Sequence, residues 1–431
     1  MPTDEADVLA NELERTDPKV ALLFEREGTF IASLLKRPAT EVSSRDMRVP
    51  LEVKSGGKFG HYNPDGGGLG RGTGSKFEKG LLPVVHNKMG IEWTRKADMS
   101  TDSARKAVLN TFRHLVSTSM AEYRRHMDSL AMTGGDGVLG TITAVANASS
   151  KDTYTFSDAV GAGGDGFDIR LLRDTNFYSV YNAALTTRRT FTSGASSGGE
   201  APIDLYDIGS KQVRFNGEVS GAIATDKVVV AGLTATPPVS LYGVKYHHSD
   251  ASTGTWLSLD RATLPQIRAN RVNAADAAFA LPFARQALNK SGNRVGIDKM
   301  TGVEAWMHPC QVDAYERGGQ LVSVINKTTK DEGLNMYFGS NMQMAGAPVK
   351  PSFSWNKKRI DFIFKAVWGR SEIQPIGYYT DKQGRKFFEV RDVDGGVAAS
   401  DIFYLHSGMN TYVNNPAICT YVDALAIPSG Y

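Results

Sequence analysis

Apolar residues recur every three or four positions between Thr101 and Met132, and this spacing predicts the longest helix of the chain. Thr101 or Asp102 can cap its start, and Gly134-Gly135 follow its end. At 1.5 Å per residue the helix would be about 45 Å long. Its apolar positions are Val108, Phe112, Leu115, Val116, Met120, Tyr123, Met127 and Leu130. We expect the opposite, basic face to be solvated, with a surface facing nucleic acid as the alternative; it carries Arg105, Lys106, Arg113, Arg124 and Arg125.

Two strand candidates enclose a glycine-rich segment before this helix. The first runs from Arg48 to Lys54, and the second runs from Leu81 to Thr94. The segment between them, 55–76, contains nine glycines together with Lys58, Arg71 and Lys76. The pattern predicts a β-hairpin much longer than a compact turn requires, with a glycine-rich, basic tip. Such a hairpin has little core of its own, so we expect it to lie against another surface.

Residues 1–27 form an acidic stretch with eight acidic and three basic side chains, a net charge of −5. Their apolar residues are spaced as one short amphipathic helix and part of a second, with Pro18 between the two. An arm of this kind rarely folds alone. We therefore expect it to pack on a neighbouring surface.

The remainder of the chain mixes strands with helices. Residues 141–264 are rich in β-branched residues, Gly, Ser and Thr, which predicts an inserted β-rich domain. Helical spacing returns near 273–289, and a strand at 305–309 leads into a short helix at 310–317. Strands are predicted again over 359–431, with turns at 381–384 and 394–396. The expected fold class is α+β.

Composition and charge narrow the classes of protein. The 431 residues include 49 basic and 46 acidic side chains, a net charge of +3, which argues against a dedicated nucleic-acid-binding protein that relies on an overall positive field. The two cysteines, Cys310 and Cys419, are too few for a disulfide framework and are expected to be reduced and buried. With neither a signal peptide nor a transmembrane segment in view, we expect synthesis in the cytoplasm and no membrane partner.

Three motifs suggest chemistry but lack its context. The glycine run at 66–76 ends in Ser75-Lys76, the reverse of the order in a phosphate-binding loop, and a strand follows it where a helix is needed. Gly194-Ala195-Ser196-Ser197-Gly198 matches the nucleophile elbow around Ser196, but it lies in a low-complexity run with no helix after it. Asp392-Val393-Asp394-Gly395 starts a calcium-loop pattern without its distal Glu. We interpret all three as loops.

No metal site is predicted either. His247 and His248 are the only adjacent histidines, and neighbouring residues of a strand point to opposite faces. No HExxH or CxxC spacing occurs. We expect no catalytic residue, no cofactor and no metal, and therefore a protein that is not an enzyme.

The order of these features resembles the tailed-bacteriophage major capsid protein family, the Hong Kong ninety-seven type fold. The segment Leu130-Ala131-Met132-Thr133-Gly134-Gly135-Asp136-Gly137-Val138 is similar to the family's helix end followed by a Gly-Asp-Gly turn and a strand. Ala305-Trp306-Met307-His308-Pro309-Cys310 is similar to its strand-to-helix step through a proline. Gly346-Ala347-Pro348-Val349-Lys350-Pro351 resembles a later strand. The likeness spans almost the whole chain outside 141–264.

The resemblance implies a division of the chain into six segments. They are an N-terminal arm at 1–46, an extended loop at 47–98, a peripheral domain with the spine helix at 99–140, an inserted β-rich domain at 141–264, an axial domain at 265–395, and C-terminal strands at 396–431 that return to the peripheral domain. Hairpin and arm cannot bury themselves, so they are expected to bury against neighbouring copies. Glycine at the tip allows close backbone approach.

The implied function is a major capsid protein that assembles with itself into pentamers and hexamers of an icosahedral head around double-stranded DNA, bound non-specifically. The implied partners are a separate scaffolding protein, a portal and a decoration or cement protein. The implied location is the virion, after synthesis in the host bacterial cytoplasm. Some members crosslink a hairpin lysine to a neighbour, and Lys54, Lys58 and Lys76 are available, but the sequence locates no buried acid beside them.

Two alternatives remain at this stage. An encapsulin-like protein shell shares the fold, and the large β-rich insertion together with the lack of a cargo-docking signature favours the virus. In a different class stands a serine hydrolase that would use Ser196 and one of the histidines.

Overall fold

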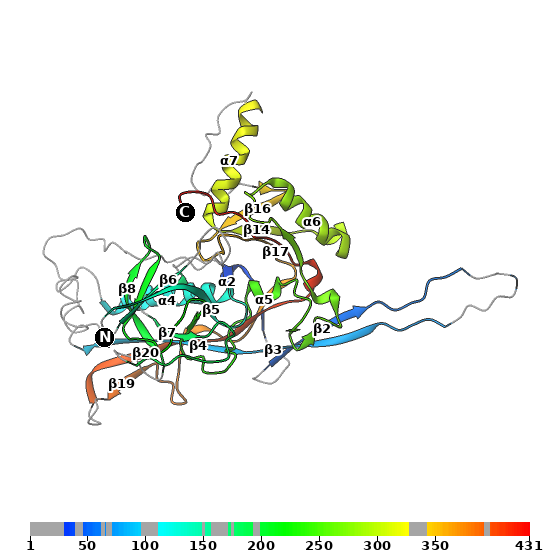
Figure 1. Ribbon diagram of the computed structural model, residues 1–431. Helices are drawn as coiled ribbons and strands as arrows, with labels where there is room; N and C mark the ends of the chain where they lie inside the picture. Colours follow the sequence, from blue (N-terminus) through cyan, green and yellow to red (C-terminus); the bar gives the residue numbers. More distant parts are fainter. Residues whose placement is uncertain are drawn as a thin grey trace. The chain divides into compact units, whose positions relative to one another are not determined.

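A computed structural model of the chain describes eleven stretches of residues. They are 30–38, 46–61, 65, 71–95, 111–148, 151–156, 171–173, 176–192, 199–326, 343–391 and 397–431. The helices expected within 1–27 and the turn at 394–396 lie outside these residues. The described residues form the predicted α+β fold (Figure 1). They belong to two compact units: unit 1 comprises 1–39, 84–128 and 371–410, and unit 2 comprises 40–83, 129–370 and 411–431.

Unit 1 is built on a five-stranded sheet. Its strands are β1 (Leu35–Pro38), β4 (Val85–Thr94), β18 (Trp368–Tyr378), β19 (Phe387–Arg391) and β20 (Val397–Val413). Strand β20 is the centre, because its Phe403 pairs with Ile91 of β4 on one side and with Phe387 of β19 on the other. The alternation of side chains places Ile91 and Phe403 on one buried face together with Trp93.

Helix α4 (Thr111–Ala131) covers the buried face of this sheet, and the end of the predicted 101–132 helix is confirmed. Residues 101–110 lie outside the described part. Tyr123 is buried, donates to the carbonyl of Asn87 at 3.0 Å and lies 2.6 Å from the hydroxyl of Ser407. Asp128 accepts the N–H groups that open the short helix α2 (Phe30–Ser33), at 3.0 and 2.9 Å. The carboxylate thereby satisfies two donors that a helix start leaves unpaired.

The solvated basic face predicted for this helix is wrong at Arg125. Arg124 is exposed, but Arg125 is only 1% exposed. Arg125 lies one turn before Asp128 on the same side of the helix, and α2 covers that side through its bonds to Asp128. Charge alone therefore did not identify the solvent-facing side. Arg105 and Lys106 lie outside the described residues.

Unit 2 contains a closed six-stranded β-barrel between residues 138 and 230. Around the barrel the strands follow the order β10 (Lys227–Val230), β5 (Val138–Ala148), β6 (Lys151–Phe156), β9 (Gln212–Phe215), β8 (Ala201–Asp207) and β7 (Phe177–Tyr181). Tyr154, Tyr178 and Phe215 are completely buried and meet at ring-centroid distances of 5.3 and 6.2 Å. Closure leaves the barrel without unpaired edges.

A six-stranded mixed sheet forms the other large part of unit 2. Its order is β13 (Asn270–Asn273), β21 (Thr420–Asp423), β17 (Ile360–Phe364), β14 (Val303–Met307), β16 (Ala347–Pro351) and β15 (Gln343–Met344). Helices α6 (Leu281–Val295) and α7 (Pro309–Asn326) lie beside it (Figure 1). The core between them is apolar and includes Ala284, Val312, Phe362 and Val422. Cys310 and Cys419 are free and buried, as predicted.

Short elements complete unit 2. They are α5 (Val244–His247), the small hairpin β11 (Thr255–Trp256) and β12 (Leu259–Asp260), and the 3₁₀ turns η2 (Pro265–Ile267), η3 (Ile297–Lys299) and η4 (Pro416–Ile418). In the described part of the chain no helix is long and apolar enough to cross a membrane.

Two helix predictions have wrong bounds. The helix expected at 273–289 starts at Leu281, because 270–273 is strand β13 and Pro282 favours the first turn of a helix. It ends at Val295, before Gly296 at φ 90°. The helix expected at 310–317 starts at Pro309 and continues to Asn326, through two glycines at 318 and 319 that lower helix propensity without ending it.

The second strand of the predicted hairpin is also wrong. The expected 81–94 strand divides at Val84 into β3 (Lys76–Pro83), which pairs with β2 (Asp46–Lys54), and β4, which joins the sheet of unit 1. Pro83 closes the β2–β3 ladder opposite Asp46 and has no N–H to extend it. The hairpin itself is confirmed, with its second strand starting five residues earlier than expected.

Gly243, at the start of α5, offers a test of this packing. A Cβ at Gly243 would lie 2.2 Å from the carbonyl oxygen of Ala131 and 2.5 Å from that of Thr133, which are backbone atoms that cannot rotate away. We predict that Gly243→Ala lowers the free energy of unfolding by about 3 kcal/mol through overpacking. Gly377→Ala is the matched control, because its Cβ would meet nothing nearer than 3.9 Å. Equal urea midpoints for the two variants would contradict this account.

Candidate assembly interface

The β2–β3 hairpin has one end in a hydrophobic core. Inward side chains of the two strands alternate with exposed ones, and Val49, Leu51, Val53 and Leu82 are buried. They pack in one cluster with residues from the 256–267 region and with Tyr412. Burial of four apolar side chains at about 1.5–3 kcal/mol each is sufficient to hold the base of the hairpin in place.

The contact with Leu257 depends on a glycine. A Cβ at Gly80 would lie 3.0 Å from the Cβ of Leu257, so any larger residue would push this contact apart. The N–H of Leu81, the next residue, donates to the carbonyl oxygen of Leu257 at 2.8 Å. Leu257 itself has φ 48° in the tight turn between β11 and β12. Backbone and side chain of one turn therefore fix the base of the hairpin.

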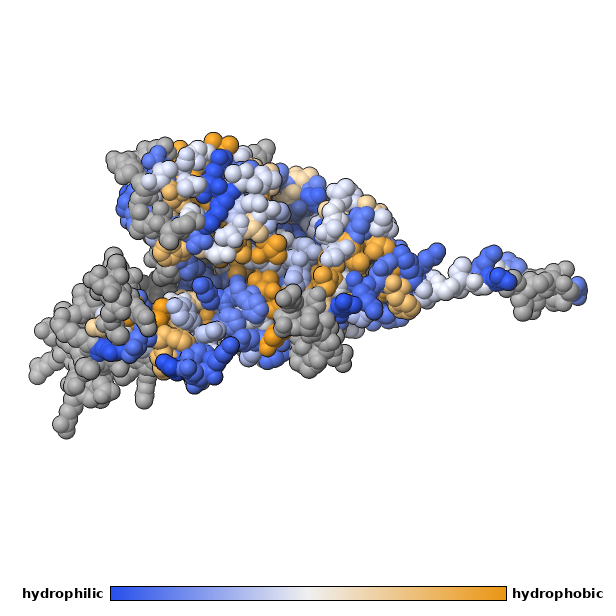
Figure 2. Space-filling view, turned by 90° about the horizontal axis from the view of Figure 1, so that it is seen from below, coloured by the Kyte–Doolittle hydropathy of each residue, from blue (hydrophilic) through white to orange (hydrophobic). Residues whose placement is uncertain are grey.

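Beyond Lys54 and Lys76 the hairpin has no such support. Its two arms continue as extended chain, and the N–H of Gly57 donates to the carbonyl oxygen of Thr73 at 2.7 Å. Every described side chain between 55 and 75 is exposed. Figure 1 shows this part extending from the β2–β3 end of unit 2 with no other element of that unit beside it. In the view of Figure 2 the same extension shows hydrophilic and intermediate residues, with the uncertain residues in grey.

Two aromatic side chains on this hairpin are unusually accessible. Phe59 is 95% exposed and Phe77 is 67% exposed. An exposed aromatic ring leaves apolar surface in water that a partner could bury. The sequence predicted that the hairpin needs another surface, but these two residues were not singled out. The glycines and lysines beside them are typical of a flexible tip, so the sequence did not identify these two rings as exposed apolar surface.

In its described residues the hairpin shows neither a phosphate-binding loop nor a buried acid beside Lys76. Residues 71–75 are extended and Lys76 starts strand β3, so no helix follows the glycine run; Gly66 to Gly70 lie outside the described residues. Lys76 pairs with Glu78 at 2.9 Å, where both side chains are partly exposed. This is an exposed ion pair of small energetic value and not a buried acid beside a lysine.

The histidines singled out in the sequence lie in the core of unit 2. The expectation that they sit on a strand is wrong: His247 ends helix α5 and His248 follows it. Trp256 donates to Nδ1 of His247 at 3.1 Å, so Nε2 of this ring is the donor to the carbonyl oxygen of Thr411, at 3.2 Å. Burial lowers the pKa of His247 to about 3 and keeps it neutral. The two rings bind different partners.

Asp361 is the centre of a buried polar network around His248. Its carboxylate accepts from Nδ1 of His248 at 2.8 Å, from the indole of Trp355 at 2.9 Å and from Arg359 at 2.7 Å. The guanidinium of Arg359 also lies 3.9 Å from the centre of the Tyr421 ring. Burial alone would raise the pKa of Asp361, but Arg359 and His248 outweigh it and lower this pKa to about 2. The network connects the α5 segment to strand β17.

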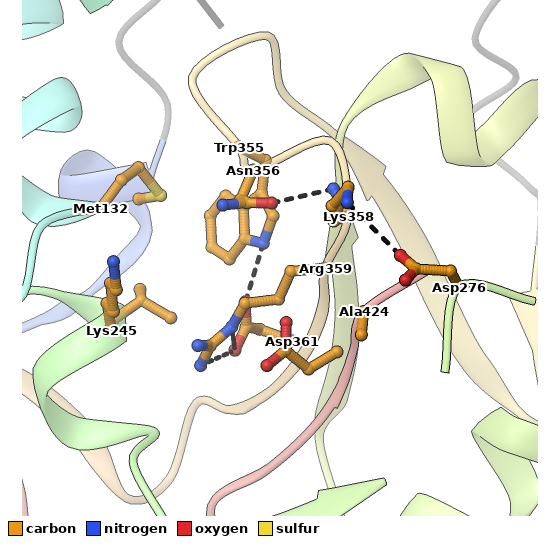
Figure 3. Close-up of a pocket in the computed structure, with 11 residues that line it drawn as sticks. Met132, Lys245, Asp276, Trp355, Asn356, Lys358, Arg359, Asp361 and Ala424 are labelled. Carbon is orange, nitrogen blue, oxygen red and sulfur yellow. Dashed lines mark hydrogen bonds and ion pairs between the residues drawn. The ribbon is translucent and has the colours of Figure 1, made fainter. Parts of the chain in front are cut away.

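A pocket of about 350 Å³ lies beside this network. Figure 3 shows Met132 and Lys245 across the space from Arg359 and Trp355. The three aspartates of its wall already have basic partners: Asp276 pairs with Lys358 at 3.3 Å, Asp361 with Arg359, and Asp423 with Arg271 at 3.1 Å. These carboxylates are therefore engaged within the chain. Charges paired in this way are typical of a structural contact between packed elements.

The remaining predicted motifs fall on other parts of the chain. Ser196 and the 392–395 segment lie outside the described residues. Among the described residues, no group of three or more His, Cys, Asp and Glu side chains is arranged to hold a metal ion.

Comparison with solved structures decides the fold. The chain matches a chain of the structure entitled "Cyanophage A-1(L) capsid asymmetric unit" with a TM-score of 0.56 and 11% identity, over 98% of each chain. The chain has the tailed-phage capsid fold. The resemblance inferred from the sequence is thus confirmed at the level of the fold.

Other solved structures match with lower scores. The holo-SrpI encapsulin of Synechococcus elongatus PCC 7942 has a TM-score of 0.47 and 8% identity over 99% of this chain and 97% of its own. The capsid of Myoviridae phage XM1 has a TM-score of 0.47 and 9% identity over 96% and 97%. No protein-family model matches the sequence, and the comparison with curated proteins finds no match.

The Asp361 network yields a prediction about stability. We predict that Asp361→Asn lowers the free energy of unfolding by about 3–5 kcal/mol, because Arg359 would remain buried without its counter-charge. Asp204→Asn is the control, since Asp204 forms partly exposed ion pairs with Lys151 and Arg214 and should cost under about 1 kcal/mol.

Urea unfolding followed by tryptophan fluorescence measures both variants. Trp355, which donates to Asp361, makes the signal sensitive to the network. A loss at Asp361 no larger than at Asp204 would contradict the claim that breaking the buried pair leaves Arg359 with a costly uncompensated charge.

Proposed function

We propose that this chain is a major capsid protein that assembles with copies of itself into the pentamers and hexamers of an icosahedral phage head. The likeness to the cyanophage A-1(L) capsid chain over 98% of both chains supports a shell-forming role. A closed shell needs heterologous contacts that close into rings. The proposal is that the hairpin supplies one of these contacts.

The observation that carries the proposal is the exposed part of the hairpin. Its base is buried in unit 2, whereas Phe59 and Phe77 keep most of their surface in water. Gly56 allows backbone contact within the hairpin, since a Cβ there would lie 2.8 Å from the amide nitrogen of Ser75. The result is a thin extension, made of two segments of the same chain, that a second copy could cover along its length.

The proposal extends to the arrangement of the chain and to its partners. We assign 1–46 to an arm, 47–98 to the extended loop, 99–140 with 396–431 to a peripheral domain, 141–264 to an insertion and 265–395 to an axial domain. The shell would enclose double-stranded DNA through non-specific contacts and would be part of the virion after synthesis in the bacterial cytoplasm. A separate scaffolding protein, a portal and a decoration protein would complete the head. The role is structural and not enzymatic.

Shortening the hairpin tests the proposal. We predict that removal of residues 56–76 leaves the subunit folded and soluble but stops assembly, because the deleted residues contribute no buried side chain among those described. Sedimentation and negative-stain imaging measure assembly, and urea unfolding measures the subunit. Loss of folding would mean that the hairpin contributes to the core of its own chain.

A point variant sharpens the same test. Phe59→Ser should reduce the assembled fraction at least tenfold at a fixed protein concentration, since one buried aromatic ring per contact is worth about 1.5–3 kcal/mol. Ile223→Ser is the control, because Ile223 is 56% exposed but lies between β9 and β10 of the barrel. Equal assembly of the two variants would contradict a role of the hairpin tip.

A further inference from the structure

His86 and His406 face each other on neighbouring strands of the unit 1 sheet. Nδ1 of His86 lies 3.3 Å from Nε2 of His406, and the ring planes differ by only 9°. The ring centroids are 5.4 Å apart, so in these nearly parallel rings the two nitrogens are the atoms that point toward each other. This is the geometry of an N–H···N hydrogen bond, in which one imidazole donates and the other accepts.

The opposite strand makes room for this pair with a glycine. His86 of β4 pairs with Gly408 of β20, one position along the same face from His406. A Cβ at Gly408 would lie 2.9 Å from Cε1 and 3.0 Å from Nδ1 of the His86 ring. Any side chain at 408 would therefore displace the ring from its position beside His406. The contact between the two histidines therefore depends on the glycine at 408.

The described groups that contact the pair carry no negative charge. Lys88 of β4 pairs directly opposite His406, and from the β18 side Tyr379 packs edge-on against the His406 ring at 6.0 Å while Gln374 approaches Gly408. In the described part of the chain, no carboxylate is hydrogen-bonded to either ring. Burial is the main cause that lowers the pKa of His406, and the charge of His86 lowers it further. Among the described residues no carboxylate contacts the pair to compensate a second proton, although the His86 ring is exposed to solvent.

The number of protons on the pair decides whether it holds together. With one proton between the facing nitrogens, the N–H···N hydrogen bond forms. One additional proton on the pair makes the donor ring positively charged and leaves the other ring neutral, so the hydrogen bond is kept. When both rings are fully protonated, both facing nitrogens are donors and two positive charges stand 3.3 Å apart beside Lys88. We propose that His86 and His406 form an acid-sensitive latch, which fastens β4 to β20 near neutral pH and opens when both rings are protonated.

The His86–His406 latch lies at one end of the β4–β20 ladder. The β4–β20 pairing ends at Val85 and Met409, next to the pair. The chain crosses between the two units at five places, and two of them, between Pro83 and Val84 and between Asn410 and Thr411, lie near the pair. Opening of the latch would therefore release the end of the β4–β20 pairing close to these two crossings. The inference concerns the sheet itself and stands independently of the proposed capsid function.

The direction of the pH effect follows from the lowered pKa of His406. The unfolded chain binds more protons than the folded chain as pH falls below about 6.5, so acid destabilises the latched sheet. Amide hydrogen exchange of the full chain, read by mass spectrometry at pH 7.5 and 5.0 and corrected for intrinsic rates, measures this locally. Peptides from the barrel strands β9 and β10 in unit 2, which contain no histidine, serve as internal references.

In the wild-type chain we expect peptides covering 85–94 and 400–409 to lose at least tenfold protection at pH 5.0, and the reference peptides to lose less. His86→Gln/His406→Gln should abolish this difference between the two pH values, and His61→Gln, on the hairpin, should keep it.

Histidine C–H exchange in the wild-type chain gives the pKa of each ring without any variant. Equal protection at both pH values, a double variant that keeps the acid response, or an unshifted pKa for His406 would overturn the latch.

Discussion

The structure depends on a hairpin that is anchored at only one end. Strands β2 and β3 bury four apolar side chains against the 256–267 region, and the remainder of the hairpin extends beyond any core of the described chain. An isolated two-stranded ribbon is marginally stable in water. Such a segment becomes stable when another surface covers it. This requirement connects the physics of one chain to the proposed function, which needs many copies.

The rest of unit 2 provides a rigid support for that anchor. The closed barrel has no free edges, and the Asp361 network fastens the α5 segment to the six-stranded sheet through a buried ion pair and its hydrogen bonds. Buried ion pairs add little net stability, but they penalise alternative arrangements strongly, because breaking them leaves a charge without water. We interpret the network as fixing the orientation of the elements beside the hairpin base.

Local patterns predicted much of this fold. The spacing of Tyr123, Met127 and Leu130 correctly located the buried face and the end of the long helix, and the glycine-rich segment correctly indicated the hairpin. Two errors arose where distant residues decide: α2 covers the side of the helix that carries Arg125, and β20 pairs with the strand that begins after Pro83. Periodicity could not identify these distant partners. The third error, at His247, is local, because the four residues of α5 are too few to show a helical period.

The functional surface was predicted only in outline, for a related reason. Sequence indicated that the hairpin needs a partner, whereas the exposure of Phe77 and the pairing of His86 with His406 depend on the register of strands. A register is set by long-range packing and by the position of turns. The resemblance to capsid proteins supplied the fold that these local signals could not specify.

Cryo-electron microscopy of the full chain, expressed with and without its neighbouring genes, tests the central claim most directly. The account predicts closed shells or capsomer rings of five and six copies, in which residues 54–76 of one copy lie against the next. A monodisperse monomer under every condition, scaffolding partner included, would contradict it. So would shells in which the hairpin contacts only its own chain.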